Sequence, residues 1–285
     1  MFVFIHFLKI SSLFIFWYFT NYINAYKHPI NFSYIKKSNV KIMYPSKQIT
    51  EKNLYQDLNS TYSDGSSEII NPVLFFTGGS NFIPNEVYTN FLYNFASSNF
   101  TLFLTNYQKS NEFKNLIQYI KNNTNQKIML VGHSSCVKLS IDLSNNFDSI
   151  NRIVFLDPVD NRLAAKDILL NLFKIRNIIK FKNITDLLII NARKSFQGSI
   201  NPISIPFIPV LSLDENNVEL GSSKSDKVII NTFNDHGHTD ILDLPWSNFM
   251  HNNNICKGSN YREYHNINNY HQQIVDIIKN FYYLD

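Results

Sequence analysis

A serine in the middle of the chain has the surroundings of a nucleophile. Residues 132–136 read Gly-His-Ser-Ser-Cys, and they lie between the apolar run 128–131 and a helical pattern. A strand that ends in Gly-x-Ser and turns into a helix is typical of a nucleophile elbow, which exposes the serine hydroxyl above a sheet. Ser134 is therefore a candidate nucleophile for acyl transfer. Taken alone, the motif favours an ordinary strand–turn–helix junction, because serines after strands are common.

The second glycine of the usual Gly-x-Ser-x-Gly elbow is replaced here by Cys136. The turn favours small residues because its backbone is strained and lies close to the next strand and helix. Cysteine is small and commonly packs as a buried apolar side chain. We expect Cys136 to be buried beneath the elbow and tolerated there, with a slightly wider helix–strand spacing. We predict no disulfide with Cys256, the other cysteine.

A base for this serine is predicted late in the chain. Catalytic groups of a parallel sheet gather at the carboxyl ends of its strands. Among the eight histidines, His236 and His238 follow the last predicted strand, 227–232. His238 is the preferred base and His236 the second candidate. His133, inside the elbow, is expected to pack beside the nucleophile.

The acid that orients the base is predicted at the end of the strand 152–156. Asp157 follows that strand directly, with Asp160 as a reserve candidate. The loop after the next strand, residues 191–198, contains no carboxylate, which favours Asp157. Because Pro158 disfavours a helical conformation before it, we expect Asp157 to be extended. A simple Asp-Pro turn is the alternative interpretation.

Two backbone amides are candidates for an oxyanion hole. In an elbow of this kind one donor is the amide after the nucleophile, here Ser135, and the other comes from an earlier strand–helix loop. The glycines of the segment 77–80 follow the apolar run Pro72–Phe76, and Gly79 is the expected donor. A glycine turn that merely closes the strand describes the same residues.

The elements that must position these residues alternate along the chain. Short apolar runs predict strands, amphipathic spacing predicts helices, and Val40–Tyr44 predicts an edge strand. This alternation predicts an α/β fold, a single domain over 26–285 with a mostly parallel central sheet and helices on both faces. The predicted strands are 72–76, 101–104, 128–131, 152–156, 186–191 and 227–232, and the predicted helices are 85–97, 112–121, 137–143, 163–176 and 268–282.

Composition limits the classes of function. The chain has 285 residues, is 44% hydrophobic and carries a formal net charge of +4. That size and apolar content allow a large core. The basic residues are scattered rather than gathered in a stripe, so nucleic-acid binding has little support. The histidines and aspartates lack the spacing of a closed metal site, and no cofactor is predicted.

Residues 1–25 differ from the rest of the chain, because they are apolar and aromatic with Lys9 as their one formal charge. We predict a secretory signal peptide with cleavage after Ala25, and hence a protein of the secretory pathway or a secreted one. An uncleaved membrane anchor is the alternative. An organelle reached through the secretory route is a further alternative.

Taken together, these motifs resemble the chlorophyllase and platelet-activating-factor-acetylhydrolase-like branch of the α/β-hydrolases. Residues 156–160, Leu-Asp-Pro-Val-Asp, are similar to the family's Asp-Pro-Val segment. Residues 237–243, Gly-His-Thr-Asp-Ile-Leu-Asp, are similar to its Gly-His-Met-Asp-Met-Leu-Asp. The elbow resembles the family's Gly-His-Ser-Arg-Gly-Gly, with Ser135, Cys136 and Val137 as departures. Thr77 stands where the family has a histidine before the oxyanion glycine.

The resemblance implies a carboxylic ester hydrolase without a cofactor, in which Ser134, Asp157 and His238 form the triad and an acyl-enzyme is released by water. It implies a small apolar ester as substrate, and conversion of chlorophyll to chlorophyllide and phytol is the leading specific activity. An apolar lid over 200–213 and peripheral contact with lipid fit such a substrate, while a loop packed against the core explains the apolar run 200–213 equally well. A lipid esterase and a catalytically impaired binding protein of the same fold are the alternatives. Oligomeric state is left open.

Overall fold

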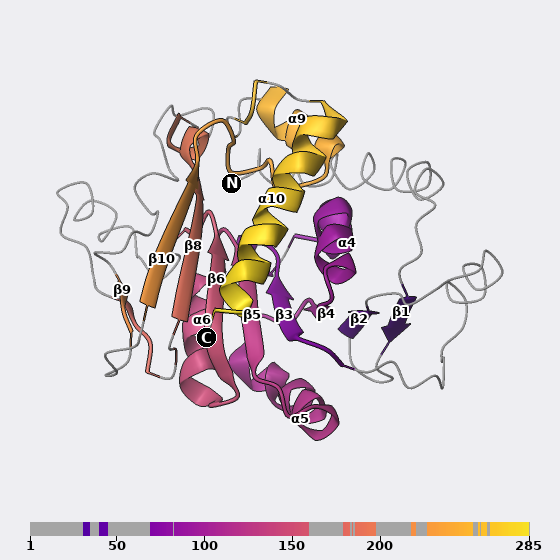
Figure 1. The fold of residues 1–285 in the computed structure, drawn as a ribbon, viewed down its shortest axis with the longest axis vertical. Helices are drawn as coiled ribbons and strands as arrows, with labels where there is room; N and C mark the ends of the chain where they lie inside the picture. Colours follow the sequence, from indigo (N-terminus) through magenta and orange to yellow (C-terminus); the bar gives the residue numbers. More distant parts are fainter. Residues whose placement is uncertain are drawn as a thin grey trace, which may run out of the picture.

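The computed structural model describes the core of the chain (Figure 1). The described residues are 31–34, 40–44, 69–81, 83–159, 179–182, 184, 186–197, 218–220, 227–252, 256, 258–260 and 263–284. Several predictions lie outside these residues, namely the leader 1–25, the helix 163–176, the lid 200–213 and the reserve acid Asp160. Among the helices that the structure describes, none is long and apolar enough to cross a membrane.

The centre of the described structure is an eight-stranded sheet with the order β1-β2-β4-β3-β5-β6-β8-β10. Only β2 is antiparallel to its neighbours β1 and β4, and all other pairs are parallel. The strands are β1 (Asn31–Tyr34), β2 (Val40–Tyr44), β3 (Pro72–Phe76), β4 (Thr101–Thr105), β5 (Ile128–His133), β6 (Ile150–Leu156), β8 (Asp186–Ala192) and β10 (Lys227–Phe233). The predicted mostly parallel sheet is confirmed. The prediction that Val40–Tyr44 is an edge strand is wrong, because β1 pairs with its outer side.

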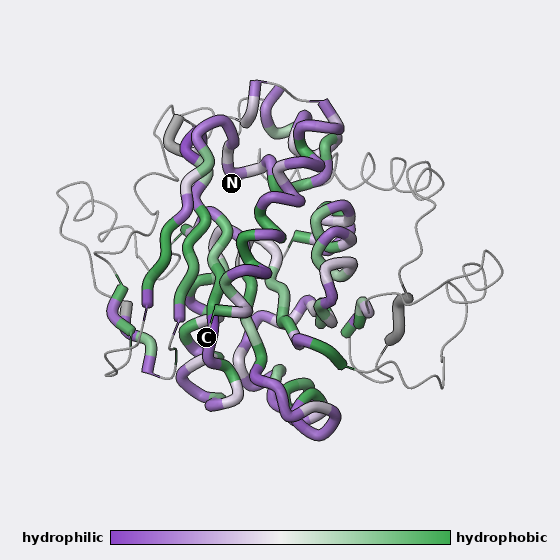
Figure 2. The backbone as a smooth tube through the Cα atoms, in the orientation of Figure 1, coloured by the Kyte–Doolittle hydropathy of each residue, from purple (hydrophilic) through white to green (hydrophobic). Residues whose placement is uncertain are grey.

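Helices cover both faces of the sheet, as predicted. On one face pack α4 (Thr89–Ser97) and α10 (Tyr264–Tyr282), and on the other α5 (Lys114–Asn123) and α6 (Val137–Asn146). Each face of the sheet has its own hydrophobic core, and alternate residues of each inner strand pack into one or the other. Val73 faces α4 and α10, while Leu74 faces α5 and α6. The inner strands are therefore apolar on both sides, and Figure 2 shows them as continuous hydrophobic segments.

Several short elements were not predicted. The predicted helices over 85–97 and 112–121 each begin with a 3₁₀ turn, η1 (Asn85–Tyr88) and η2 (Ser110–Phe113). The remaining ones are β1, α3 (Gly78–Asn81), β7 (Ile179–Lys180), η3 (Arg193–Gln197), β9 (Val218–Glu219) and α9 (Leu244–Asn252), with β7 and β9 paired in a separate two-stranded sheet. Apart from α9, they are too short for an apolar period to show in the sequence.

Candidate active site

The predicted elbow is the turn between β5 and α6. Ser134 has a φ of 58°, in the left-handed region that residues other than glycine rarely adopt. Two main-chain hydrogen bonds fix this conformation. The Ser134 N–H donates to the Leu156 carbonyl at 3.0 Å, and the Ser134 carbonyl accepts from the Val159 N–H at 3.0 Å. The strained serine is thus held by the end of β6, and its side chain remains partly exposed.

The cysteine of the elbow fits because Gly132 has no side chain. A Cβ atom on Gly132 would lie 2.2 Å from the Cys136 Sγ, far inside van der Waals contact. Cys136 is fully buried, as predicted, and burial raises the pKa of its thiol to about 12. It therefore stays protonated near neutral pH and is a packing residue rather than a second nucleophile. Cys136 and Cys256 are both free thiols.

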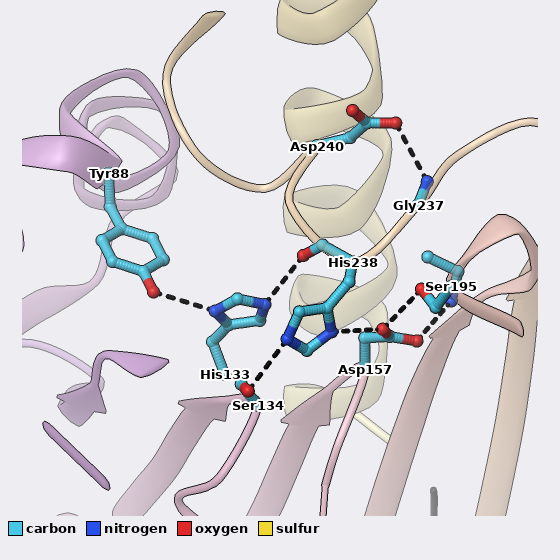
Figure 3. A network of polar contacts seen from close by, with 9 residues as sticks. Tyr88, His133, Ser134, Asp157, Ser195, Gly237, His238 and Asp240 are labelled. Atoms are coloured by element: carbon cyan, nitrogen blue, oxygen red, sulfur yellow. Dashed lines mark hydrogen bonds and ion pairs between the residues drawn. The ribbon is translucent and has the colours of Figure 1, made fainter. Parts of the chain in front are cut away.

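The structure brings Ser134, His238 and Asp157 together in one line (Figure 3). His238 Nε2 lies 2.9 Å from Ser134 Oγ, and His238 Nδ1 lies 2.5 Å from Asp157 Oδ2. The three residues follow β5, β10 and β6, whose carboxyl ends meet at one edge of the parallel sheet. In this arrangement a histidine can take the serine proton while a carboxylate orients the ring.

Asp157 is not extended, contrary to the expectation from Pro158. Its φ is 46°, so the extended conformation that a following proline favours is overridden at this strand end. The turn is held by the Asp157 N–H, which donates to the Ile190 carbonyl at 2.7 Å. It directs the carboxylate toward His238 and toward the loop that follows β8.

The last residue of β8 and the loop after it supply two hydrogen bonds that the sequence did not reveal. The Ala192 N–H donates to Asp157 Oδ1 at 2.9 Å, and the Ser195 hydroxyl donates to Asp157 Oδ2 at 2.6 Å. Both Ser195 and Asp157 are buried. The segment 191–198 thus has no carboxylate but provides donors to one. A serine in a loop is too common a feature to signal this role from sequence alone.

His236, the second candidate base, is placed elsewhere. Its ring stacks on Tyr270 with centroids 3.9 Å apart, and its Nδ1 lies 3.6 Å from Asp240 Oδ2. Asp240 is fully buried, and its carboxylate accepts from Ser247 Oγ at 2.8 Å and from the Gly237 N–H at 2.9 Å. These contacts fix the loop that carries His238. The structure therefore separates the two histidines into a ring beside Ser134 and a ring that supports the loop.

The two oxyanion candidates lie in turns that follow two neighbouring parallel strands, β5 and β3. Ser135 opens the turn into α6, and Gly79 lies in α3, directly after β3. Gly79 is exposed and has a φ of 63°, which explains the need for glycine there. The neighbouring Gly78 N–H is already used, since it donates to the Tyr88 hydroxyl at 2.9 Å.

Asn81 holds this loop, a role that the sequence did not indicate. Its Nδ2 donates to the carbonyls of Thr105 and Tyr107, each at 2.8 Å, and its Oδ1 accepts from the Thr77 N–H at 3.0 Å. The Thr77 hydroxyl also lies 3.3 Å from Asn81 Oδ1. Thr77, which replaces the histidine of the resembling family, therefore takes part in anchoring the loop.

The described residues contain no group of three or more His, Cys, Asp or Glu side chains placed to hold a metal ion.

The sheet order, with one antiparallel strand beside a parallel set and a strained serine after β5, defines the α/β-hydrolase fold. No protein family model matches the chain, and no curated protein matches it in sequence.

Solved structures match it at low similarity. A ferulic acid esterase from Streptomyces cinnamoneus has a TM-score of 0.48 and 9% identity, covering 83% of this chain and 79% of its own. A sugar hydrolase from Lactococcus lactis has a TM-score of 0.45 and 10% identity, covering 89% and 100%. An esterase domain from Rhodothermus marinus has a TM-score of 0.42 and 7% identity, covering 77% and 90%. Similarity at this level carries no information about activity or substrate.

Proposed function

We propose that this protein is a serine carboxylic ester hydrolase in which Ser134, His238 and Asp157 form a catalytic triad. The observation that carries the proposal is the continuous hydrogen-bonded line from Asp157 Oδ2 through both nitrogens of His238 to Ser134 Oγ. A left-handed serine at the head of this line is a costly conformation, and such strain is concentrated at functional sites.

Catalysis would follow from this geometry in two half-reactions. Ser134 Oγ attacks the ester carbonyl while His238 Nε2 takes its proton, and the amides of Ser135 and Gly79 donate to the oxyanion. His238 then protonates the departing alcohol, leaving an acyl group on Ser134. Water, activated by the same histidine, releases the acid. The Asp157 carboxylate stabilises the imidazolium.

For the substrate we propose an apolar ester, with chlorophyll as the leading specific case. The support is the resemblance of the segments 156–160 and 237–243 to chlorophyllase motifs. A lipid ester is the competing substrate class, and peripheral contact with lipid belongs to either. We further propose that 1–25 is a signal peptide, which would bring the enzyme into the secretory pathway.

A catalytically impaired binding protein is the competing function, since Ser135 and Cys136 depart from the usual elbow. Fluorophosphonate labelling of the full chain distinguishes the two. We expect an adduct on Ser134 of the wild type and none in Ser134→Ala. Folded wild-type protein that remains unlabelled would contradict the enzyme proposal.

Substrate class is tested on the same preparation with three esters, namely p-nitrophenyl butyrate, a phosphatidylcholine vesicle and chlorophyll a in detergent. Release of chlorophyllide supports the chlorophyllase proposal. Turnover of the first two without chlorophyllide overturns it and favours a lipid esterase. Ser144→Ala is the matched control, because it removes a buried hydroxyl that donates to a carbonyl inside α6 at 3.1 Å.

A further inference from the structure

His133 lies between the two loops that carry the catalytic groups. Its Nδ1 is 2.8 Å from the Tyr88 hydroxyl, and its Nε2 is 2.9 Å from the main-chain carbonyl of His238 (Figure 3). Both His133 and Tyr88 are buried. The histidine that follows the elbow glycine therefore contacts the base through its backbone, in addition to packing beside the nucleophile.

The partners determine where the hydrogens are. The His238 carbonyl can only accept, so His133 Nε2 carries the hydrogen and Nδ1 is an acceptor. The Tyr88 hydroxyl must then donate to Nδ1, and its oxygen accepts from the Gly78 N–H at 2.9 Å. The result is one directed chain from the Gly78 amide through Tyr88 and His133 to the His238 carbonyl, with every member satisfied.

The ionisation of the two side chains keeps this direction. Burial lowers the pKa of His133 well below its usual value, and the neighbouring His238 lowers it further. Burial raises the pKa of Tyr88 above its usual value. His133 thus remains neutral and Tyr88 remains a donor across the pH range of an assay.

The neutral state of His133 also matters for its neighbour. The rings of His133 and His238 have centroids 4.6 Å apart at an interplanar angle of 33°. When His238 takes the serine proton it becomes a cation, and a second cation at this distance would oppose that step. A neutral aromatic ring does not.

From this geometry, and resting on the hydrolase function proposed above, we propose that His133 and Tyr88 are positioning residues. They hold the catalytic base His238 in a fixed position relative to the Gly78–Gly79 turn, which carries an oxyanion donor. They join segments far apart in the chain, since Gly78 follows β3 and His238 follows β10. The hydrogen bond between His133 and Tyr88 also packs against the turn at Gly78, because a Cβ on Gly78 would be 3.2 Å from both His133 Nδ1 and the Tyr88 hydroxyl. Neither residue needs to touch the substrate for this role.

The experiment compares kcat and KM of full-length variants with p-nitrophenyl butyrate. Tyr88→Phe and His133→Phe keep an aromatic ring but break the chain, and we expect kcat to fall by roughly ten- to a hundredfold with little change in KM. His133→Gln places an amide N–H near the position of Nε2, so we expect it to recover much of the lost kcat. Tyr283→Phe is the control, because its hydroxyl accepts from Asn71 Nδ2 just before β3, at the opposite end of that strand from Gly78. Its kcat should equal that of the wild type.

The proposal would be overturned if both Phe variants had the kcat of the wild type. It would also be overturned if His133→Gln and His133→Phe lost the same amount of kcat together with the same fall in Tm. Fluorophosphonate labelling of the wild type shows separately whether the hydrolase function holds. If the wild type is unlabelled, amide hydrogen exchange decides the positioning role. We expect the segment 237–240 to exchange faster in His133→Phe than in Tyr283→Phe, and identical exchange would contradict it.

Discussion

Removal of the Ser195 hydroxyl tests how the triad acid is held. Asp157 Oδ2 accepts from both Ser195 Oγ at 2.6 Å and His238 Nδ1 at 2.5 Å, while Oδ1 accepts from the Ala192 N–H. In Ser195→Ala the carboxylate would keep two of these three donors. It would lose one of the two bonds that, besides the histidine itself, fix the orientation of the carboxylate.

The expected magnitude follows from the kind of bond that is lost. A short hydrogen bond from a buried hydroxyl to a carboxylate contributes about 1.5–3 kcal/mol. We therefore expect the free energy of unfolding of Ser195→Ala to fall by about 2 kcal/mol in urea titrations. We expect kcat to fall about tenfold, equivalent to about 1.4 kcal/mol, with KM nearly unchanged, since the loss acts on the orientation of the base.

The control for this prediction is Ser144→Ala, in which a buried serine loses a bond to a neutral carbonyl instead. We expect that variant to lose at most about 1 kcal/mol of stability and no activity. If Ser195→Ala matched Ser144→Ala in both measurements, the hydroxyl would have no special part in holding Asp157, and the reasoning above would be refuted.

Three further changes probe the packing and the buried charges around the site. Gly132→Ala should destabilise the fold by about 1–3 kcal/mol in urea titrations, because its methyl group would collide with Cys136, and adding Cys136→Gly should restore much of the loss. Burial lowers the pKa of His271 to about 4, so the unfolded chain binds more protons than the folded one between pH 4 and 6.5, and stability falls on acidification. At pH 5 the loss from this residue amounts to about 2 kcal/mol. His271→Gln should remove that loss from a pH series of unfolding curves. Burial raises the pKa of Asp243 to about 7, so this residue stabilises the folded chain most below about pH 4, and the stabilisation is lost as the pH rises to 7. Its pH dependence is therefore opposite to that of His271. Asp243→Asn should abolish this fall in stability with rising pH in the same series.

Each of these has a distinct contradicting outcome. A Gly132→Ala protein as stable as the wild type would show that the elbow relaxes freely around the cysteine. For the two titrating residues the comparison is the difference between variant and wild type across pH 4–8. A difference that is constant with pH would show that the residue's pKa is the same in the folded and unfolded chain.

The sequence predicts the sheet well because its inner strands are apolar on both faces. Runs such as Pro72–Phe76 and 128–131 need no knowledge of their neighbours to be recognised as buried strands. The chain order of Ser134, Asp157 and His238 follows from strand ends, and the structure places these three side chains in contact. Strand ends of a parallel sheet share an edge, so position along the chain carries information about proximity in space.

The supporting residues escape prediction for the opposite reason. Tyr88 and Ser195 lie in 3₁₀ segments and Asn81 lies in the four-residue α3. Each acts through hydrogen bonds to atoms of another segment of the chain. Such bonds depend on where two loops meet, and no period or spacing in the sequence encodes that meeting. The conformation of Asp157 is a related case, because Pro158 excludes one region of φ/ψ space without selecting among the others.

The departures of the elbow acquire a physical explanation in the structure. A glycine on each side of the nucleophile would leave room between β5 and α6, and here one side chain fills that room from the helix. The Cys136 Sγ occupies the space beside Gly132. A side chain is therefore accommodated at position 136, on the helix side, only while position 132, on the strand side, is glycine. Since the strain at Ser134 is borne by hydrogen bonds to Leu156 and Val159 and not by the helix glycine, the nucleophile keeps its geometry. The replacement of glycine by Cys136 should therefore affect the stability of the elbow more than the reactivity of Ser134.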